Sequence, residues 1–428
     1  MKKCVVSAMI AALMIGVAGC GEKASALGNV EIPQQEIDPA VEERLRDEID
    51  QSLEEYDVEL MREGYLDYSM RLFAGSVEEG KNSMISPVSV MMALDMAAAG
   101  AHGETQSQIT ELFCAGAEQS QMEHFCRDLL DRYEESQDVE LHLANSIWIK
   151  DTIADGINED YLVLTDHIFD AEAVLAPFDQ ATVDAVNGWC DEKTDGMIDH
   201  LLDEITPGSK LILLNATALD APWAKPYEDH QVREETFTNA DGDMEDVKML
   251  NSTEYSYFET EDAVGFMKYY EGGEYAFLAM LPKESMAVDQ YVQSLTGEKY
   301  MEFWNSRTTD YDVWTKLPEF TYEYELTMND VLADMGMKQA FDSETADFTG
   351  ITADTNLYVD LVLHKTFIEV GQYRTRAAAV TAVEMTDGCA MVELSEIKEV
   401  YLVRPFVYAI VEVDTGMPLF IGTLQSAQ

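Results

Sequence analysis

Few residues in this sequence have the types and spacing that enzyme chemistry needs. Ser395 and Lys398 fit the Ser-x-x-Lys spacing of some serine nucleophiles, and residues 193–196 read Lys-Thr-Asp-Gly, close to a Lys-Thr-Gly motif that accompanies them. The two motifs occur in the wrong order, their third partner is missing, and Ser395 falls in an expected loop. The chain also lacks the Gly-x-Ser-x-Gly, His-Glu-x-x-His and P-loop motifs. We therefore expect no catalytic residue and no enzyme.

Side chains that could bind a metal are equally scattered. The seven histidines show no ligand spacing, and residues 241–243, Asp-Gly-Asp, read as a hairpin turn rather than a calcium loop. Cys114, Cys126, Cys190 and Cys389 form neither a Cys-x-x-Cys pair nor a metal-type cluster. Cys114 and Cys126 could form a disulfide if two neighbouring helices bring them together; otherwise buried thiols are expected. The sequence predicts no metal and no cofactor.

The amino-acid composition is that of a large and strongly acidic chain. Its 428 residues include 27 basic and 82 acidic ones, for a net charge of -55 at pH 7, and 47% are hydrophobic, enough for a packed core. Such a surface repels nucleic acid, heparin-like polyanions and anionic lipid headgroups, whereas it attracts cationic proteins. Two interpretations stay open: the charge steers a basic partner, or it only keeps a secreted protein soluble.

The N-terminus has the pattern of a targeting segment. Lys2 and Lys3 precede an apolar run over residues 5–18 that is too short for a permanent membrane helix. The small residues directly before Cys20 resemble a bacterial lipobox, which predicts a signal peptide over residues 1–19 and acylation of Cys20. An ordinary signal peptide with an incidental cysteine is the alternative. Acyl chains on Cys20 would anchor a secreted protein at the outer face of a bacterial membrane, its only membrane contact.

The remaining chain divides into a short tether and one body. Residues 20–45 combine glycines, prolines and acids without apolar periodicity, which predicts a flexible tether. No linker interrupts residues 46–428, so we expect a single domain there. Its first half is mainly helical, with helical spacing over residues 42–73 and a helix start at Ser86-Pro87, where Ser86 would be the cap. Strand-like runs follow at residues 141–149, 211–219, 275–281, 312–320, 356–370, 401–413 and 419–424, an order typical of an α+β fold.

The most informative stretch runs from Leu357 to Val383. A strand-like run through Val370 changes into a tract of small and β-tolerant residues at 375–383, and a second strand-like block begins at Val400. Small side chains allow a new strand to enter an existing sheet without forcing the core apart. The tract therefore suggests a segment that can join a sheet.

Several short blocks, in this order, resemble the serpin family over about residues 65–424. They are residues 82–89, 100–105, 187–198, 214–216 with Trp223, 226–227, 281–282, 317–320 and 404–406. Each block alone is weak, but six or more in register are specific. The resemblance implies an α+β serpin fold with three β-sheets, about nine helices and an exposed reactive-centre loop.

The resemblance also implies an activity, the suicide inhibition of a serine or cysteine protease. The protease cuts the loop and is caught as an acyl-enzyme, while the N-terminal side of the loop inserts as a new central strand. In such a chain the folded form stores free energy that cleavage releases, and we expect a monomer. A non-inhibitory serpin, acting as a protease substrate or a surface binding protein, is the alternative.

The hinge of the loop falls on residues 372–379 in this resemblance. Thr375, Ala377, Ala378 and Ala379 match the inhibitory pattern, whereas Gln372 and Arg374 do not. Arg374 replaces a glycine, and its charged side chain would need room at the top of the sheet, which could slow insertion. Many members pair a glutamate at position 372 with a lysine at position 319. Here Gln372 and Glu319 exclude that ion pair, so we expect a slightly weaker latch.

The position of the scissile bond depends on the insertion length. The family's usual count of seventeen residues from Gln372 ends at Gly388-Cys389, whereas counting back from residues 404–406 ends near Leu394. Extra inserted residues would leave slack, so we prefer a bond within Gly388, Cys389 and Ala390, with Met391 and Leu394 as alternatives. Residues 377–397 contain no Lys or Arg, which favours an elastase-like, chymotrypsin-like or subtilisin-like protease over a trypsin-like one.

The resemblance assigns four further residues to positions beneath the loop. Ser86, Asn215 and His364 match the shutter, a hydrogen-bonded cluster under the central sheet, and Trp223 matches the breach, where the loop enters. Taken singly, each could equally be an ordinary buried residue with its polar atoms satisfied.

Overall fold

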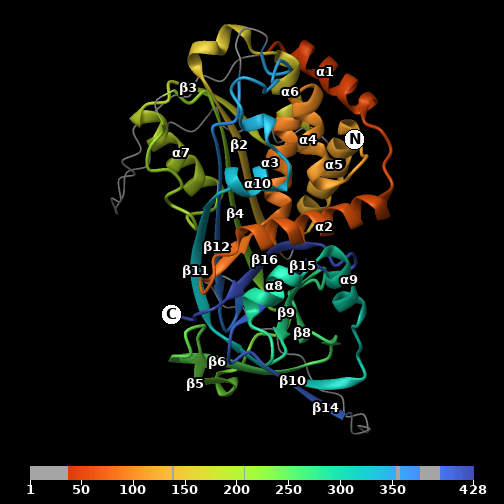
Figure 1. Ribbon diagram of the computed structural model, residues 1–428, viewed down its shortest axis with the longest axis vertical. Helices are drawn as coiled ribbons and strands as arrows, with labels where there is room; N and C mark the ends of the chain where they lie inside the picture. The colour runs from red at the N-terminus through yellow and green to blue at the C-terminus, as the bar shows by residue number, and fades with distance from the viewer. Residues whose placement is uncertain (1–36, 137–138, 207, 353–356, 376–395) are drawn as a thin grey trace, which may run out of the picture. The chain divides into compact units, whose positions relative to one another are not determined.

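Three β-sheets and ten α-helices make up the residues that the computed structural model describes, namely 37–136, 139–206, 208–352, 357–375 and 396–428 (Figure 1). All of them belong to one compact unit, Ile32–Gln428. Ten helices among the described residues agree with the expected nine or so. The helices are α1 (Pro39–Ser52), α2 (Val58–Ser76), α3 (Pro87–Ala99), α4 (Gly103–Phe113), α5 (Gln119–Glu135), α6 (Glu159–Phe169), α7 (Gln180–Lys193), α8 (Val288–Ser294), α9 (Gly297–Asn305) and α10 (Asn329–Met335).

The largest sheets have six strands each, and a third has four. We call the sheet that carries the candidate site the central sheet. Its strands, in order across the sheet, are β11 (Phe320–Thr327), β12 (Leu361–Val370), β13 (Arg374–Thr375), β4 (Leu211–Pro222), β2 (Glu140–Lys150) and β3 (Glu172–Ala176).

The second six-stranded sheet is the core sheet, and the four-stranded sheet keeps that name. The core sheet has the order β1 (Ser83–Ile85), β16 (Pro418–Leu424), β15 (Phe406–Glu412), β9 (Tyr275–Pro282), β8 (Ala263–Tyr269) and β7 (Tyr257–Glu259). The four-stranded sheet has the order β14 (Glu396–Tyr401), β10 (Tyr311–Pro318), β6 (Met244–Glu254) and β5 (Val232–Thr238).

Apolar residues on both faces of β4 explain why its sequence is an almost continuous hydrophobic run. Leu211 and Leu213 face the large core with α3, whereas Ile212 and Leu214 face a smaller core under α7 that contains Trp148. Figure 1 shows α7 on one side of the central sheet and α3 on the other. A strand covered on both faces needs no polar alternation. The central sheet is therefore packed between two hydrophobic layers.

Helix α3 is buried nearly all round, beneath the central sheet. Pro87 fits its first turn, and Gly100 follows its last residue. Twelve of its thirteen residues are buried, as expected of a helix that is hydrophobic on every face. The predicted helix start at Ser86-Pro87 is confirmed, but the Ser86 side chain makes no capping hydrogen bond.

Helix α1 occupies part of the segment that the sequence predicted to be a tether. It begins at Pro39 behind Asp38, whose carboxylate accepts a hydrogen bond from the Ala40 N–H at 2.9 Å. Its Arg46 and Asp50 contact His167 on α6. Residues 39–45 are therefore helical, and the tether prediction is wrong for them. Residues 20–36, like the predicted lipidation site Cys20, lie outside the described residues.

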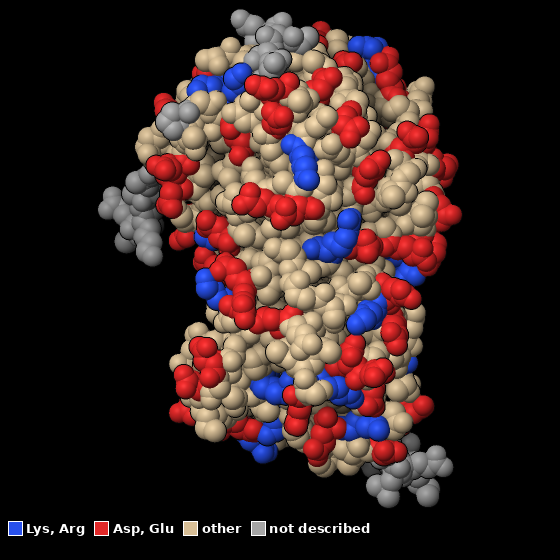
Figure 2. Space-filling view, in the orientation of Figure 1, with Lys and Arg blue, Asp and Glu red and all other residues tan. Residues whose placement is uncertain are grey.

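Two further sequence questions are settled in the described part of the chain. Cys114, Cys126 and Cys190 are free, buried thiols, so Cys114 and Cys126 form no disulfide; Cys389 lies outside the described residues. None of the described helices is both long and apolar enough to cross a membrane. Figure 2 shows carboxylates spread over the visible face, in keeping with 82 acidic against 27 basic residues.

Candidate functional site

The candidate site is the contact between β4 and β12, which we call the seam. The two strands are hydrogen-bonded in parallel, with Leu361 to Thr366 opposite Ile212 to Thr217. At one end the two-residue strand β13 lies between them, antiparallel to both, with Thr375 opposite Val370 and Ala221. Further insertion along the seam would replace one parallel contact by two antiparallel ones, and antiparallel pairing is slightly more stable per residue. The seam is thus closed, with a strand already started at its end.

Thr375 is held firmly at the point where the chain enters the sheet. Its side chain is buried, with 1% of the residue exposed, and its hydroxyl forms a hydrogen bond of 2.8 Å with the Tyr270 hydroxyl. The partner Ala221 is small and also buried, so the hydroxyl and methyl of a threonine fit. The predicted hinge residue therefore lies inside the sheet already, before any cleavage.

The side chain of Arg374 lies beside β4 and not in the hydrophobic core. Its guanidinium donates to both carboxylate oxygens of Asp220, at 2.7 and 2.9 Å, and the two side chains are only 20% and 17% exposed. A charge-assisted contact of this kind is stronger than a neutral hydrogen bond. The side chain that replaces the family's glycine is thus accommodated by an acid on the strand that borders the seam.

Gln372 is held by hydrogen bonds, although the usual ion pair between positions 372 and 319 is absent. Its amide donates to the Tyr227 carbonyl at 2.9 Å and to the Asp229 carboxylate at 3.1 Å. Glu319 instead pairs with Lys248 at 3.4 Å. The loss of the Glu–Lys pair is therefore offset, at least in number of contacts, by two hydrogen bonds from the glutamine.

Trp223 lies directly beneath the turn that leads into β13. Its indole N–H donates to the Gly371 carbonyl at 2.9 Å, and its ring stacks on Tyr270 at 4.6 Å between centroids. The ammonium of Lys268, which is 3% exposed, lies 5.5 Å from the same ring and pairs with Glu254 at 3.0 Å. The cation–π contact and the buried ion pair of Lys268 hold the Trp223 ring in place beneath this turn. The predicted breach residue is in contact with the hinge.

His364 lies in the middle of the seam and is fully buried. Its Nε2 accepts a hydrogen bond from the Ser86 N–H at 3.0 Å, and its Nδ1–H donates to the side-chain amide oxygen Oδ1 of Asn215. Because the backbone N–H must donate, Nε2 must be unprotonated and the proton belongs on Nδ1. Burial lowers the pKa of His364 to about 3, so the ring is neutral near pH 7.

The hydrogen-bonded cluster extends to residues that the sequence argument did not name. The Asn215 amide donates to Asn145 Oδ1 at 2.5 Å and also to the Ser89 hydroxyl. The Thr217 hydroxyl donates to the same Ser89 oxygen at 2.5 Å. Ser86 contributes its backbone only, since its hydroxyl is buried without a hydrogen-bond partner among the described residues. Ser86 thus joins the cluster through its backbone N–H, and Ser89, three residues later in the same motif, supplies the hydroxyl.

Part of the predicted site falls on residues that the structure does not describe. These are Ala377, Ala378 and Ala379 of the hinge, the preferred bond at Gly388, Cys389 and Ala390, and the alternatives Met391 and Leu394. The described residues hold no group of three or more His, Cys, Asp or Glu side chains that could bind a metal.

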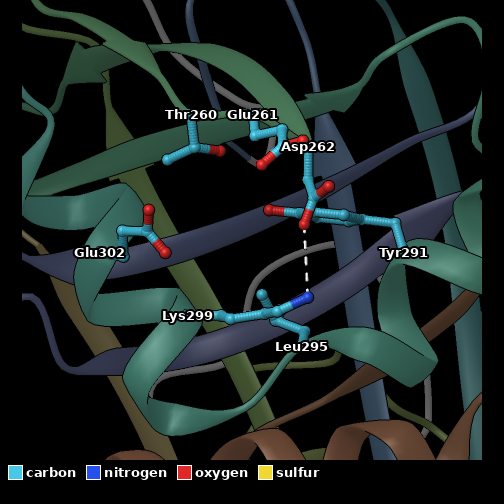
Figure 3. Close-up of a pocket in the computed structure, with 7 residues that line it drawn as sticks. All are labelled: Thr260, Glu261, Asp262, Tyr291, Leu295, Lys299 and Glu302. Carbon is cyan, nitrogen blue, oxygen red and sulfur yellow. Dashed lines mark hydrogen bonds and ion pairs between the residues drawn. The ribbon is translucent and has the colours of Figure 1, made fainter.

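A cavity elsewhere in the described part takes no part in the seam. It has a volume of about 340 Å³, and Lys299 pairs with Asp262 across it at 3.3 Å (Figure 3). Thr260, Glu261, Tyr291, Leu295 and Glu302 complete its walls. Since these walls are mostly charged or polar, the cavity suits neither an apolar ligand nor the loop.

The family of the chain follows from comparison with known proteins. A family model described as serpin (serine protease inhibitor) matches residues 63–426. The chain belongs to the serpin family. The α+β fold with three sheets that the sequence blocks predicted is thereby confirmed.

Solved structures and a curated relative agree with this assignment. This serpin is 36% identical to the thermophilic serpin Tengpin, whose native-state crystal structure it matches with a TM-score of 0.80, over 87% of this chain and 95% of that one. The latent state of Tengpin gives a TM-score of 0.75, over 88% and 100%. Leukocyte elastase inhibitor A of Mus musculus is 27% identical over 358 residues, 81% of this chain and 93% of that protein.

Proposed function

We propose that this serpin inhibits a serine protease by trapping it as an acyl-enzyme. The observation that carries the proposal is the seam, a closed parallel contact between β4 and β12 with Thr375 already buried at its end. In this proposal the protease serine forms an ester with the carbonyl carbon of the scissile bond, and the amine side of the loop leaves. The freed chain then extends β13 along the seam, where each new residue gains two antiparallel neighbours.

The length of the seam supports the preferred scissile bond. From Thr375 to Gly388 there are 388 − 375 = 13 residues, which span about 43 Å as a strand. Thr375 is opposite Ala221, so 221 − 211 = 10 residues of β4, or about 33 Å, remain for the inserting chain to pair with. A bond at Leu394 would add six residues and about 20 Å of chain beyond the end of the sheet. We therefore place cleavage within Gly388, Cys389 and Ala390, so that the ester bond ends up about three residues past the far end of β4 rather than about nine.

Small and apolar residues around that bond favour an elastase-like, chymotrypsin-like or subtilisin-like target. The likeness to a leukocyte elastase inhibitor supports the same class. The net charge of -55 favours a basic protease as partner. We further propose that acylation of Cys20 displays a monomeric inhibitor on the outer face of a bacterial membrane, where extracellular proteases would meet it.

Incubation with elastase, chymotrypsin and subtilisin, followed by denaturing gels, tests the proposal. A stable adduct near the summed mass of the two proteins is the expected result. Cleavage near residue 388 without an adduct would instead support a non-inhibitory serpin, for which the departure at Arg374 is the one argument. Mass spectrometry of the released C-terminal fragment identifies the bond. A trypsin-like protease that formed adducts as efficiently would refute the proposed specificity.

A further inference from the structure

Three large hydrophobic side chains are exposed together on the four-stranded sheet. Tyr255, Trp314 and Ile397 are 61%, 45% and 46% exposed. They belong to, or directly follow, the neighbouring strands β6, β10 and β14, at the lower end of Figure 1. Clustered apolar side chains on an otherwise charged surface mark an interaction site more often than scattered ones do.

The strand register places Trp314 and Ile397 on one face, with Tyr255 at the end of the neighbouring strand. Asp312 is opposite Ile397 in β14, so these two side chains share one face, and Tyr255 directly follows Glu254, the last residue of β6, which is opposite Val313. Trp314 is two residues along from Asp312 and therefore on the same face. Its neighbours Val313 and Thr315 are buried on the other face of the sheet. We call Tyr255, Trp314 and Ile397 the aromatic patch.

Two carboxylates, Asp312 and Glu399, border the aromatic patch, and Lys316, two residues beyond Trp314 on the same face, pairs with Glu235. Asp312 is opposite Ile397, and Glu399 is opposite Trp314. The nearest lysine on β14, Lys398, points to the opposite face, where its ammonium lies 4.6 Å from the Tyr311 ring centroid. An apolar centre with an acidic rim complements a partner whose contact surface is apolar and bordered by basic side chains.

The position of the aromatic patch indicates its occupant. Ile397 is the second described residue after the loop, so the patch lies at the C-terminal root of the segment that a protease must bind to cut residue 388. A protease engaged there extends well beyond the few loop residues in its active site. Tyr and Trp are the residue types that contribute most when buried at such contacts.

We propose that the aromatic patch is a second docking surface for the target protease, which it recognises through an apolar area with a basic border. This proposal rests on the proposed function, because it assumes that a protease attacks the loop. The patch would raise the rate at which the protease is captured without affecting what happens after cleavage. Capture rate and partitioning between adduct and cleaved serpin are therefore separate readouts.

The test compares Tyr255→Ala/Trp314→Ala with a matched control, Val58→Ala/Leu60→Ala, which removes side chains that are 67% and 49% exposed on α2. The measured quantity is the second-order rate constant of loop attack, counted as adduct plus cleaved serpin, for the protease that attacks the wild type fastest. We expect a loss of about tenfold or more for the patch variant and less than about twofold for the control. Adduct fractions should be equal in all three proteins.

Other outcomes separate the explanations. Equal rates for patch variant and wild type would overturn the docking surface and leave the inhibitor proposal intact. A concentration-dependent dimer that the patch variant abolishes would assign the surface to a second copy instead. Failure of every protease to attack the wild-type loop would end both proposals. Asp312→Lys gives a second reading without truncating an aromatic ring: it should slow capture of a basic protease, most strongly at low ionic strength.

Discussion

Acid should loosen the seam through His364. The folded protein holds the pKa of this histidine at about 3, whereas its ordinary value is 6.5. A histidine whose pKa is lowered on folding stabilises the folded state above pH 6.5, and the stabilisation is lost as the pH falls towards 3. At pH 5 the loss is 1.5 pH units multiplied by 1.36 kcal/mol, or about 2 kcal/mol. Protonation at Nε2 would place two N–H donors face to face, because Ser86 already donates there.

Hydrogen exchange of the backbone amides in β4 and β12 measures the opening of the seam directly. The free energy of opening at Leu213 to Thr217 should fall by about 2 kcal/mol between pH 7 and pH 5, after correction for intrinsic exchange rates. His364→Asn keeps a donor and an acceptor but cannot titrate. We expect it to weaken the seam at pH 7 by about 1–3 kcal/mol and to remove this part of the pH dependence.

The buried Glu123, whose pKa is raised to about 7, makes the folded protein more stable as the pH falls, which is opposite to the effect of His364. The pH dependence of the wild type alone is therefore a poor test. The variant must be compared with the wild type at each pH, because the difference cancels everything except His364. If His364→Asn and the wild type lost the same opening free energy between pH 7 and pH 5, the assignment of a neutral, hydrogen-bonded histidine to the seam would be refuted.

Three further predictions concern other contacts. Burial raises the pKa of Glu123 to about 7, so as the pH rises this carboxyl ionises in the unfolded chain before it ionises in the folded protein. The free energy of unfolding should therefore fall by about 3 kcal/mol between pH 4.5 and pH 7. Glu123→Gln should lack this dependence in denaturant unfolding. Thr375→Arg would bury a charge in the sheet and should convert an inhibitor into a substrate, whereas Tyr373→Arg, at a residue 47% exposed, should still form adducts on gels. Asp220→Ala should raise the number of serpin molecules consumed per protease inhibited, because Arg374 loses the Asp220 carboxylate beside β13, and adding Arg374→Gly should reverse this. An unchanged stoichiometry would contradict a role for the Arg374–Asp220 pair in insertion.

The sequence motifs located the middle of the seam well. Asn215 and His364 are adjacent across β4 and β12 as expected, and Trp223 contacts the turn before β13. Ser89 was within the motif that contained Ser86, but one turn of helix decides which hydroxyl faces the sheet, and the sequence alone does not fix that rotation. Motifs succeed here because short blocks encode the strands and the helix start that meet at this point.

Contacts between distant residues were beyond the sequence argument. Asp220 is 154 residues from Arg374, and Tyr270 is 105 residues from Thr375. Nothing local distinguishes an aspartate at the end of a strand, or the second of two tyrosines, from ordinary surface or core residues. Helix α1 was predicted only in part: the helical spacing over residues 42–73 covers most of it, but residues 39–45 were also assigned to the tether, and Leu45 is its one buried residue.

The central claim is that the closed seam is a higher-energy arrangement that loop cleavage releases. Thermal melting of the intact serpin, and of the same serpin cut at residue 388 by a protease and purified, tests this most directly. We predict that the cut form melts at a much higher temperature and that the amides of β4 and β12 gain protection along their whole length. A cut form that melts at or below the temperature of the intact protein would contradict the account.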